Sequence, residues 1–433
     1  MTDAILPRTE AGADSTAKRL ARRHAAERRF QIYGRLAILT AVLMLGTLLG
    51  SIVLQGTPAF FQSEMRLEVD FAPDVIDPKG ALDPADLRRA DYQLLITKAL
   101  YAQFPDVTGR KDKRALKQLA SSDAGFTLRK MVLADPSLVG TTQSVWVKTN
   151  DDADQYIKHG DRNAKVEEGG RLSPAQVDWL KALEAKGDIE ERFNTTFFTA
   201  GDSREPEQAG ILGALVGSAL TLIVTLAISF PLAVMAAVYL EEFAPKNKWT
   251  DMIEVNINNL AAVPSIVFGL LGLAVFLNVF GMPRSAPVVG GLVLALMTLP
   301  TIIIAARAAL KSVPPSIRQA ALGMGASPLQ VVLHHVLPLA MPGILTGTII
   351  GMAQALGETA PLIMIGMVAF IADVPGGFTD PATVLPVQIF IWADAPERAF
   401  LAKTSAAIMV LVAFLIVMNA LAVVLRKRFE RRW

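Results

Sequence analysis

Long apolar runs alternate with polar segments along the chain, and the runs exceed the core helices of an ordinary globular protein. A helix needs about 20 mostly apolar residues to cross the hydrocarbon core of a bilayer. Six stretches reach this length and predict membrane-spanning helices over residues 36–55, 209–239, 255–280, 288–306, 342–371 and 404–425. The fifth is too long for one straight crossing, so we expect it to tilt, or to end near Pro361 and re-enter.

The segment between the first two predicted spans has a different pattern. Residues 57–208 contain no spanning run and carry 21 basic and 26 acidic residues, which predicts a water-soluble domain. Ser173-Pro174 and Gly187 bracket an expected helix, and residues 144–149 read as a strand. The predicted fold class is therefore an all-α polytopic membrane protein with six transmembrane helices and an inserted α+β domain.

Basic residues near the predicted spans indicate the orientation. Eighteen Lys and Arg residues lie in the two termini and the loops 240–254 and 307–337, against three in the two short loops on the other side, which are Arg284, Arg398 and Lys403. The positive-inside rule then predicts cytoplasmic termini and a periplasmic insert. The expected parts are a basic cytoplasmic tail (1–35), a first transmembrane helix (36–56), the periplasmic insert (57–208), a five-helix transporter domain (209–425) and a cytoplasmic C-terminal tail (426–433).

The composition excludes several kinds of site. The chain has no cysteine, which rules out disulfides, thiolate metal sites and cysteine nucleophiles, and its net charge of +2 gives no general basis for nucleic-acid binding. Asp151, Asp152 and Asp154 lack the glycine and distal glutamate of an EF-hand loop, so we expect a solvated turn there and no metal. No G-x-x-x-x-G-K-[ST] sequence occurs, so we expect neither a bound cofactor nor enzymatic ATP hydrolysis on this chain.

The loop between the fourth and fifth predicted spans, residues 312–337, has the most informative pattern. It predicts two short helices joined across residues 323–328, with Pro328 at the first position of the second helix. The loop resembles the signature of ABC importer permeases, which is E-A-A, three residues, G, nine residues, then I-x-L-P. The corresponding positions here are Gln319, Ala320, Ala321, Gly325, His335, Leu337 and Pro338, with Gln319 replacing the glutamate and His335 the isoleucine. The resemblance implies a coupling helix that docks on a cytoplasmic ATPase.

Two further stretches resemble the permeases of phosphate importers. Residues 262–270 are similar to V-P-S-I-x-x-G-L, and residues 357–362 match the G-E-T-A-P-L run of the A-type (PstA) family. Together with the insert, they resemble the subset of that family with an enlarged first periplasmic loop. The resemblance implies a heterodimer with PstC, two PstB subunits that bind ATP and Mg²⁺, and a phosphate-binding protein, PstS.

The fifth predicted span contains one ionisable residue, Glu358, near its middle. Carboxylates inside a membrane are costly and usually face a bundle interior or water, so Glu358 predicts a gate or a buried ion pair; a structural, hydrogen-bonded glutamate is the alternative. In one continuous helix, Glu358 falls on the same face as three glycines spaced for close helix packing. The candidate helix-packing residues are Gly343, Gly347 and Gly351, and the candidate translocation path or gate comprises Gln354, Gly357, Glu358 and Thr359.

Two other functions fit parts of this pattern. A permease for another small solute or oxyanion would share the same coupling loop. A membrane sensor with a periplasmic ligand domain would need a cytoplasmic output domain, and the predicted tails of about 35 and 8 residues are too short for one. The sequence therefore predicts a permease subunit of an ATP-driven inorganic phosphate importer, embedded in the bilayer of the bacterial inner membrane.

Overall fold

The computed structural model describes residues 10–159 and 172–429 and divides into two units, residues 1–54 and 55–433. The first unit consists largely of helix α1, which runs without a break from Glu10 to Gly56. The segment 1–35, expected as a tail, is thus helical from Glu10 onward. Its Ala, Arg and Glu residues are strong helix formers, so they extend the apolar helix rather than ending it.

The inserted domain is built on a three-stranded antiparallel sheet in the order β2-β1-β3. Strand β1 (Phe61–Asp70) lies in the centre, between β2 (Thr142–Lys148) and β3 (Ile189–Phe193). Because side chains alternate along a strand, Met65, Leu67 and Val69 of β1 are buried on one face, while the residues between them point to the other.

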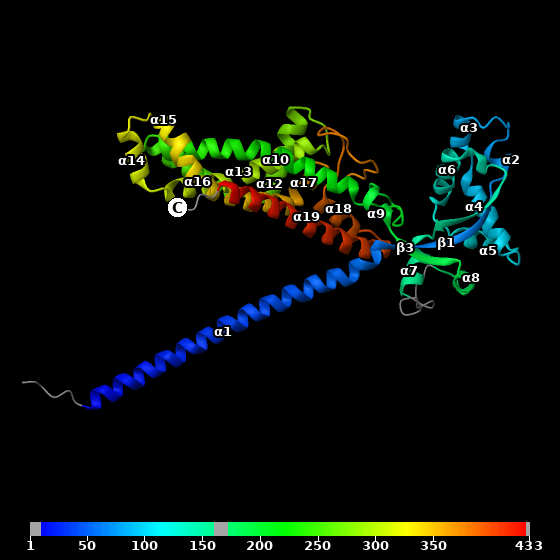
Figure 1. The fold of residues 1–433 in the computed structure, drawn as a ribbon, viewed down its shortest axis with the longest axis horizontal. Coiled ribbons are helices and arrows are strands. Elements are labelled where there is room, and N and C mark those ends of the chain that lie inside the picture. The colour runs from blue at the N-terminus through cyan, green and yellow to red at the C-terminus, as the bar shows by residue number, and fades with distance from the viewer. Residues whose placement is uncertain (1–9, 160–171, 430–433) are drawn as a thin grey trace, which may run out of the picture. The chain divides into compact units, whose positions relative to one another are not determined.

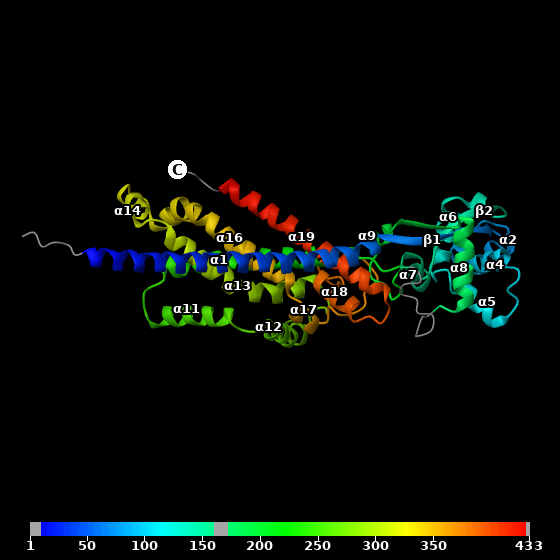
Figure 2. The ribbon, with the colours of Figure 1, turned by 90° about the horizontal axis from the view of Figure 1, so that it is seen from below.

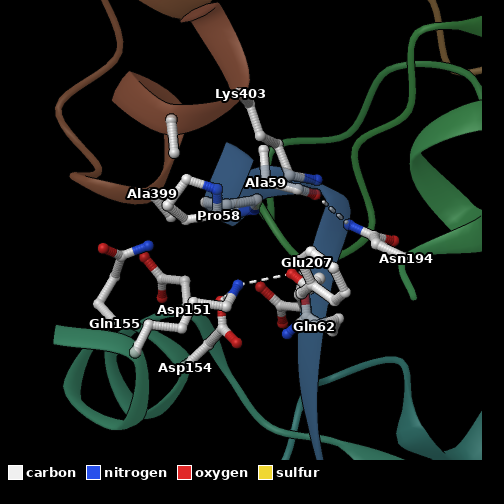
Figure 3. A pocket seen from close by; sticks show the side chains of 14 residues that line it. Pro58, Ala59, Gln62, Asp151, Asp154, Gln155, Asn194, Glu207, Ala399 and Lys403 are labelled. Carbon is white, nitrogen blue, oxygen red and sulfur yellow. Dashed lines mark hydrogen bonds and ion pairs between the residues drawn. The ribbon is translucent and has the colours of Figure 1, made fainter. Parts of the chain in front are cut away.

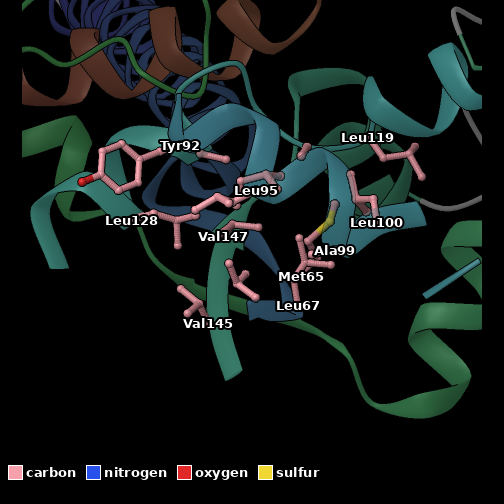
Figure 4. Packing of buried hydrophobic residues seen from close by; sticks show 14 of the residues in the cluster. Met65, Leu67, Tyr92, Leu95, Ala99, Leu100, Leu119, Leu128, Val145 and Val147 are labelled. Carbon is pink, nitrogen blue, oxygen red and sulfur yellow. The ribbon is translucent and has the colours of Figure 1, made fainter. Parts of the chain in front are cut away.

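Helices cover the buried face of this sheet. Helices α4 (Tyr92–Gln103) and α6 (Ala124–Ala134) pack against each other and against the strands, and Figure 4 shows Leu95 and Leu100 of α4 meeting Met65 and Val147. The remaining elements are η1 (Thr57–Phe60), α2 (Pro73–Ile76), α3 (Pro84–Arg89), α5 (Arg110–Lys117), η2 (Pro136–Leu138), α7 (Asp151–His159), α8 (Pro174–Lys186) and α9 (Thr195–Thr199). The insert is therefore α+β, as predicted.

The membrane part is entirely helical. Its elements are α10 (Leu212–Val238), the π-turn η4 (Tyr239–Phe243), α11 (Lys248–Ala261), α12 (Ser265–Gly272), η5 (Leu273–Val279), α13 (Pro287–Ser312), α14 (Pro315–Gly323), α15 (Pro328–Gln330), η6 (Val331–Val336), α16 (Leu337–Gly357), α17 (Ala360–Met364), α18 (Leu385–Ala393) and α19 (Ala399–Phe429). Helices α10 and α13 lie side by side, and α13 packs in turn on α16 (Figures 1 and 2). Over the described residues, five helices are long and apolar enough to cross a membrane, or six if α11 and α12–η5 count as one bent span.

The third predicted span differs from the straight helix expected, and the fifth takes one of its two expected forms, an end near Pro361. The third, residues 255–280, is bent by 99° between α11 and α12, because Pro264 lacks the N–H that would continue the helix. The fifth, residues 342–371, stops at Gly357 and leaves only the short α17 beyond it. Pro361 explains the stop, since its ring would clash with the carbonyl of Gly357, four residues earlier.

Candidate functional site

The predicted coupling loop folds as two short helices joined by a tight turn. Helix α14 ends at Gly323, and Gly325 adopts a φ of +88°, a left-handed conformation that suits glycine. Ser327 then caps α15: its hydroxyl accepts from the Gln330 N–H at 3.3 Å, and the Gln330 side-chain oxygen accepts from the Ser327 N–H at 2.9 Å. The expected start at Pro328 is confirmed.

The tip of this loop presents apolar side chains to its surroundings. Its exposed large side chains are Leu322, Met324, Leu329 and Leu333, and Met324 is 78% exposed. Among the signature positions, Gln319, Ala320 and Gly325 are exposed, Ala321 is buried, and Leu337 and Pro338 are half-buried at the start of α16. A rigid, apolar tip of this kind is suited to a protein groove that covers it.

Arg318 holds α14 against the ends of the neighbouring membrane helices. Its guanidinium donates to both carboxylate oxygens of Glu242 on η4, at 2.6 and 3.2 Å. It also donates to the carbonyl of Val313 at 2.7 Å and to that of Leu310, at the end of α13, at 3.0 Å. One side chain therefore joins the loop to the ends of two spanning helices. The hydrogen bond that Arg318 donates to the Glu242 carboxylate raises the pKa of Arg318 above its ordinary value.

A second ion-pair group lies at the same ends of these helices. Arg307 on α13 lies 2.6 Å from Glu254 on α11 and 3.5 Å from Glu241 on η4, and Lys311 lies 3.6 Å from Glu241. In the sequence these cations served only as orientation signals, and their partners were missed. The acidic pair at residues 241–242, placed where a span ends, is the signal that could have suggested them.

The sequence predicted Glu358 near the middle of the fifth span. The structure instead places it where the helix is interrupted. It caps the C-terminus of α16 with extended φ and ψ of −80° and 122°, directly after Gly357. Glu358 and Thr359 are half-buried, whereas Gln354 and Gly357 are exposed. In the part of the chain that the structure describes, no basic side chain forms an ion pair with the Glu358 carboxylate.

The three glycines of α16 lie against a neighbouring helix. A Cβ atom on Gly343 would lie 2.6 Å from the Ala309 Cβ, and one on Gly347 would lie 2.1 Å from the Ala305 Cβ. Gly351 faces Ile302 at a looser 3.4 Å. These glycines therefore set the close approach of α16 to α13. The break after Gly357 separates Glu358 from this packed face.

The two interrupted spans meet beside this break. Gly269 of α12 lies against Pro361, where an added Cβ would come within 2.6 Å of the Pro361 Cα, and Gly272 lies against Ile365. These contacts follow the chain in the same order, so α12 and α17 run in the same direction. The two motifs that resemble phosphate permeases are thus in direct contact and hold the irregular backbone at Glu358 in place.

Polar side chains of the inserted domain and of α19 line one small pocket, among them Asp154, Glu207 and Lys403 (Figure 3). Lys403 of α19, which the sequence placed in a short loop, is buried, and its ammonium donates to the Ala209 carbonyl at 2.6 Å. Glu207 is also buried and accepts from the Ser121 hydroxyl at 2.7 Å. Burial raises the pKa of Glu207 and lowers that of Lys148, whose ammonium donates to Thr196.

The expected solvated turn at residues 151–154 is wrong. These residues begin α7, because the Asn150 side chain caps it by accepting from the Ala153 N–H at 2.9 Å. Asp154 is buried, and its carboxylate accepts from the Ser63 N–H at 2.7 Å and from the Lys158 ammonium at 2.5 Å. Over residues 10–159 and 172–429, the structure contains no cluster of acidic or histidine side chains suited to a metal ion.

Known protein families match the N-terminal and the C-terminal portions of the chain separately. Residues 229–433 match the family described as binding-protein-dependent transport system inner membrane component, and residues 17–167 match a domain of unknown function, DUF3333. Phosphate transport system permease protein PstA 1 of Mycobacterium tuberculosis is 32% identical over 231 residues, which cover 52% of this chain and 74% of that protein. This chain belongs to the PstA family of phosphate transport permeases. PstA of Yersinia pestis is 31% identical over 214 residues, covering 49% of this chain and 71% of that protein.

Two other proteins are also similar to this chain. The probable ABC transporter permease YqgI of Bacillus subtilis is 36% identical over 168 residues, and the chain spans only 56% of its length. An inward-facing structure of the MetNI methionine ABC transporter aligns with 51% of this chain and 95% of its own, at 19% identity and a TM-score of 0.40. As a PstA-family protein, the chain is a multi-pass inner-membrane permease subunit of an ABC importer with the type I permease fold. It is a transport component rather than an enzyme, and such permeases work with ATPase and substrate-binding subunits.

Proposed function

We propose that this chain forms half of the membrane path of an ATP-driven importer of inorganic phosphate. The observation that carries the proposal is the break between α16 and α17, where residues 357–362 carry the G-E-T-A-P-L sequence. Irregular backbone at membrane depth is tolerated where it is buried in protein or lines a water-filled cavity. The family relatives are named phosphate transport permeases, which supports phosphate as the substrate.

The partners follow from the same proposal. A PstC-type permease completes the path, PstB-type subunits bind ATP and Mg²⁺, and a PstS-type protein delivers phosphate. Glu358 does not bind phosphate directly, because two negative charges repel each other. Since the described residues supply no cation to Glu358, we infer that the second permease supplies one and that this pair is a gate.

Coupling to ATP hydrolysis runs through α14. Closure of the ATPase pair pulls on the exposed tip around Met324, and Arg318 passes that movement to η4 and α13. The close contact of Gly347 with Ala305 makes α13 and α16 move together, so the pull reaches the break at Glu358. Access to the path then alternates between the two sides of the membrane.

The proposed orientation places both termini in the cytoplasm and residues 57–208 in the periplasm. The native chain lacks cysteine, so a single cysteine reports its own position without interference. Asp112→Cys and Lys181→Cys, both on the exposed surface of the insert, should react with an impermeant thiol reagent in intact spheroplasts. Labelling that requires membrane rupture would reverse the topology.

The substrate and the gate are tested together in proteoliposomes that contain the assembled transporter. Phosphate uptake should depend on ATP, and excess sulfate or molybdate should not inhibit it. Glu358→Gln keeps the shape of the side chain but removes its charge, so this variant should assemble and lose uptake. Asp394→Asn, which removes an exposed charge before α19, is the matched control and should transport normally. Normal uptake by Glu358→Gln would mean that Glu358 has only a structural role. Transport of sulfate instead of phosphate would mean that the chain belongs to an importer of another oxyanion.

A further inference from the structure

A continuous series of aromatic rings leads from the interior of the protein to its surface at the base of the inserted domain. The buried rings of Trp392 and Phe197 lie 6.4 Å apart, and Phe198 follows at 5.0 Å from Phe197. Phe193 stacks on Phe198 at 5.7 Å, and Phe61 lies 6.4 Å from Phe193. The outer three are strongly exposed for phenylalanine, at 40% for Phe198, 57% for Phe193 and 41% for Phe61.

Hydrogen bonds fix the level of these rings relative to α10. The Phe197 carbonyl accepts from the Ile211 N–H at 2.8 Å, and the Ala200 carbonyl accepts from the Leu212 N–H at 3.1 Å. Helix α9, which carries Phe198, is therefore bonded to the first residue of α10. With 27 residues, α10 is about 40 Å long, whereas the hydrocarbon core is about 30 Å thick. The end of α10 thus reaches the interfacial layer, and Phe198 lies there with it.

Helix α19 independently indicates that the start of β1 lies near the membrane surface. Gly56, which precedes η1 and β1, lies against Ala406 of α19, where an added Cβ would come within 2.9 Å of the Ala406 nitrogen. Helix α19 begins at Ala399, so this contact lies about two turns inside its end. Phe61 follows Gly56 by five residues and pairs with Phe193 across the sheet. The first residue of β1 is therefore also near the membrane surface.

We propose that Phe61, Phe193 and Phe198 form an interfacial anchor that inserts into the headgroup–acyl boundary of the bilayer beside the inserted domain. Trp and Tyr are enriched at membrane interfaces, and interfacial helices bury Trp, Phe and Leu at the headgroup–acyl boundary. Three adjacent exposed phenylalanines are unfavourable in water. The two ends of β1 differ accordingly: Phe61 is at the membrane end, and the exposed carboxylates Glu68 and Asp70 are at the other. The anchor holds the base of the insert at a fixed depth.

The test uses spin labels on single cysteines in the complete transporter, reconstituted in nanodiscs of phosphatidylethanolamine and phosphatidylglycerol. Phe193→Cys and Phe198→Cys carry the label in the proposed anchor. Leu133→Cys is the matched control: its 37% exposure is similar, and it lies on the last turn of α6. Phe71, directly after β1, donates its N–H to the Thr141 carbonyl at 2.9 Å and accepts from the Gly140 N–H at 2.8 Å. Because η2, which precedes these two residues, packs on α6, the last turn of α6 lies near the far end of β1.

Power-saturation measurements compare collisions of each label with oxygen, which concentrates in lipid, and with a water-soluble nickel chelate. We expect the labels at 193 and 198 to collide several-fold more with oxygen than with nickel, and the label at 133 to show the reverse. Nickel access at 193 and 198 equal to that at 133 would overturn the proposal. Protection from both reagents would also overturn it, because a protein surface rather than lipid would then cover the rings.

Discussion

Replacing Arg318 by methionine should detach the coupling helix from the membrane helices. Methionine keeps an apolar stem of similar reach but removes the guanidinium, which makes two contacts with Glu242 and two with the backbone carbonyls of Val313 and Leu310. Glu242 would be left with only 11% of its side chain exposed and without its cation. The change therefore removes a partner from a largely desolvated charge, which is the costly way to break an ion pair.

The size of the effect follows from these contacts. Breaking a fully buried pair costs about 3–5 kcal/mol, and an exposed pair contributes about 0–1 kcal/mol. The Arg318 and Glu242 side chains are 23% and 11% exposed, so we expect a loss of about 2–3 kcal/mol. Each 1.4 kcal/mol changes an equilibrium constant by about tenfold. The equilibrium between α14 bound to the membrane helices and α14 detached from them should therefore shift about 30- to 150-fold.

Hydrogen exchange and transport measure this shift independently. In Arg318→Met, amides of residues 318–326 should lose protection by that factor, and ATP-dependent phosphate uptake should fall while ATP hydrolysis continues. Lys311→Met is the matched control, since the Lys311 side chain is 58% exposed and its ammonium lies 3.6 Å from Glu241. Unchanged exchange in Arg318→Met, or an equal effect of the two substitutions, would refute the assignment of Arg318 as the link.

Three further predictions follow from other contacts. Gly325→Trp should insert in the membrane but fail to co-purify with the ATPase, because a φ of +88° is strained for any residue other than glycine and a bulky ring on the exposed tip would obstruct docking; normal co-purification would contradict this. Burial raises the pKa of Glu207, so thermal stability should fall as the pH rises through that raised pKa, where the buried carboxyl must ionise. Glu207→Gln should flatten this decline in a thermal melt, and an unaltered slope would assign the decline to another group. Gly347→Val should lower stability by about 1–3 kcal/mol or more through the clash with Ala305, whereas Gly323→Ala, in open space, should change it by less than about 1 kcal/mol, as thermal unfolding can measure.

Local signals in the sequence predicted local structure well. Ser173, with Gln176, forms the capping box of α8, and Gly187 ends that helix with a φ of +75°, as the Ser-Pro and Gly pattern indicates. The turn before Pro328 was equally readable, since it also depends on neighbouring residues. The family was identifiable for a related reason: its motifs are short and contiguous.

The apolar length of residues 342–371 left two possibilities, a tilted helix or an end near Pro361, and the clash of Pro361 with the Gly357 carbonyl, four residues earlier, decides for the end. Features that depend on distant residues could not be predicted in this way. Lys403 is hydrophilic and close to a loop, so burial was not expected. Only the return of the chain at Ala209, nearly two hundred residues earlier, supplies its acceptor and covers it.

The contact between Gly269 and Pro361 has an evolutionary consequence. Because an added Cβ at position 269 would come within 2.6 Å of the Pro361 Cα, neither residue can change freely while the other stays as it is. Substitutions in residues 262–270 and in residues 357–362 should therefore occur together in evolution. A substitution that abolishes function in one motif should be rescued by a compensating change in the other. Selection for restored growth from a Gly269→Ala parent should accordingly recover second-site changes on α17, although that helix is remote in the sequence.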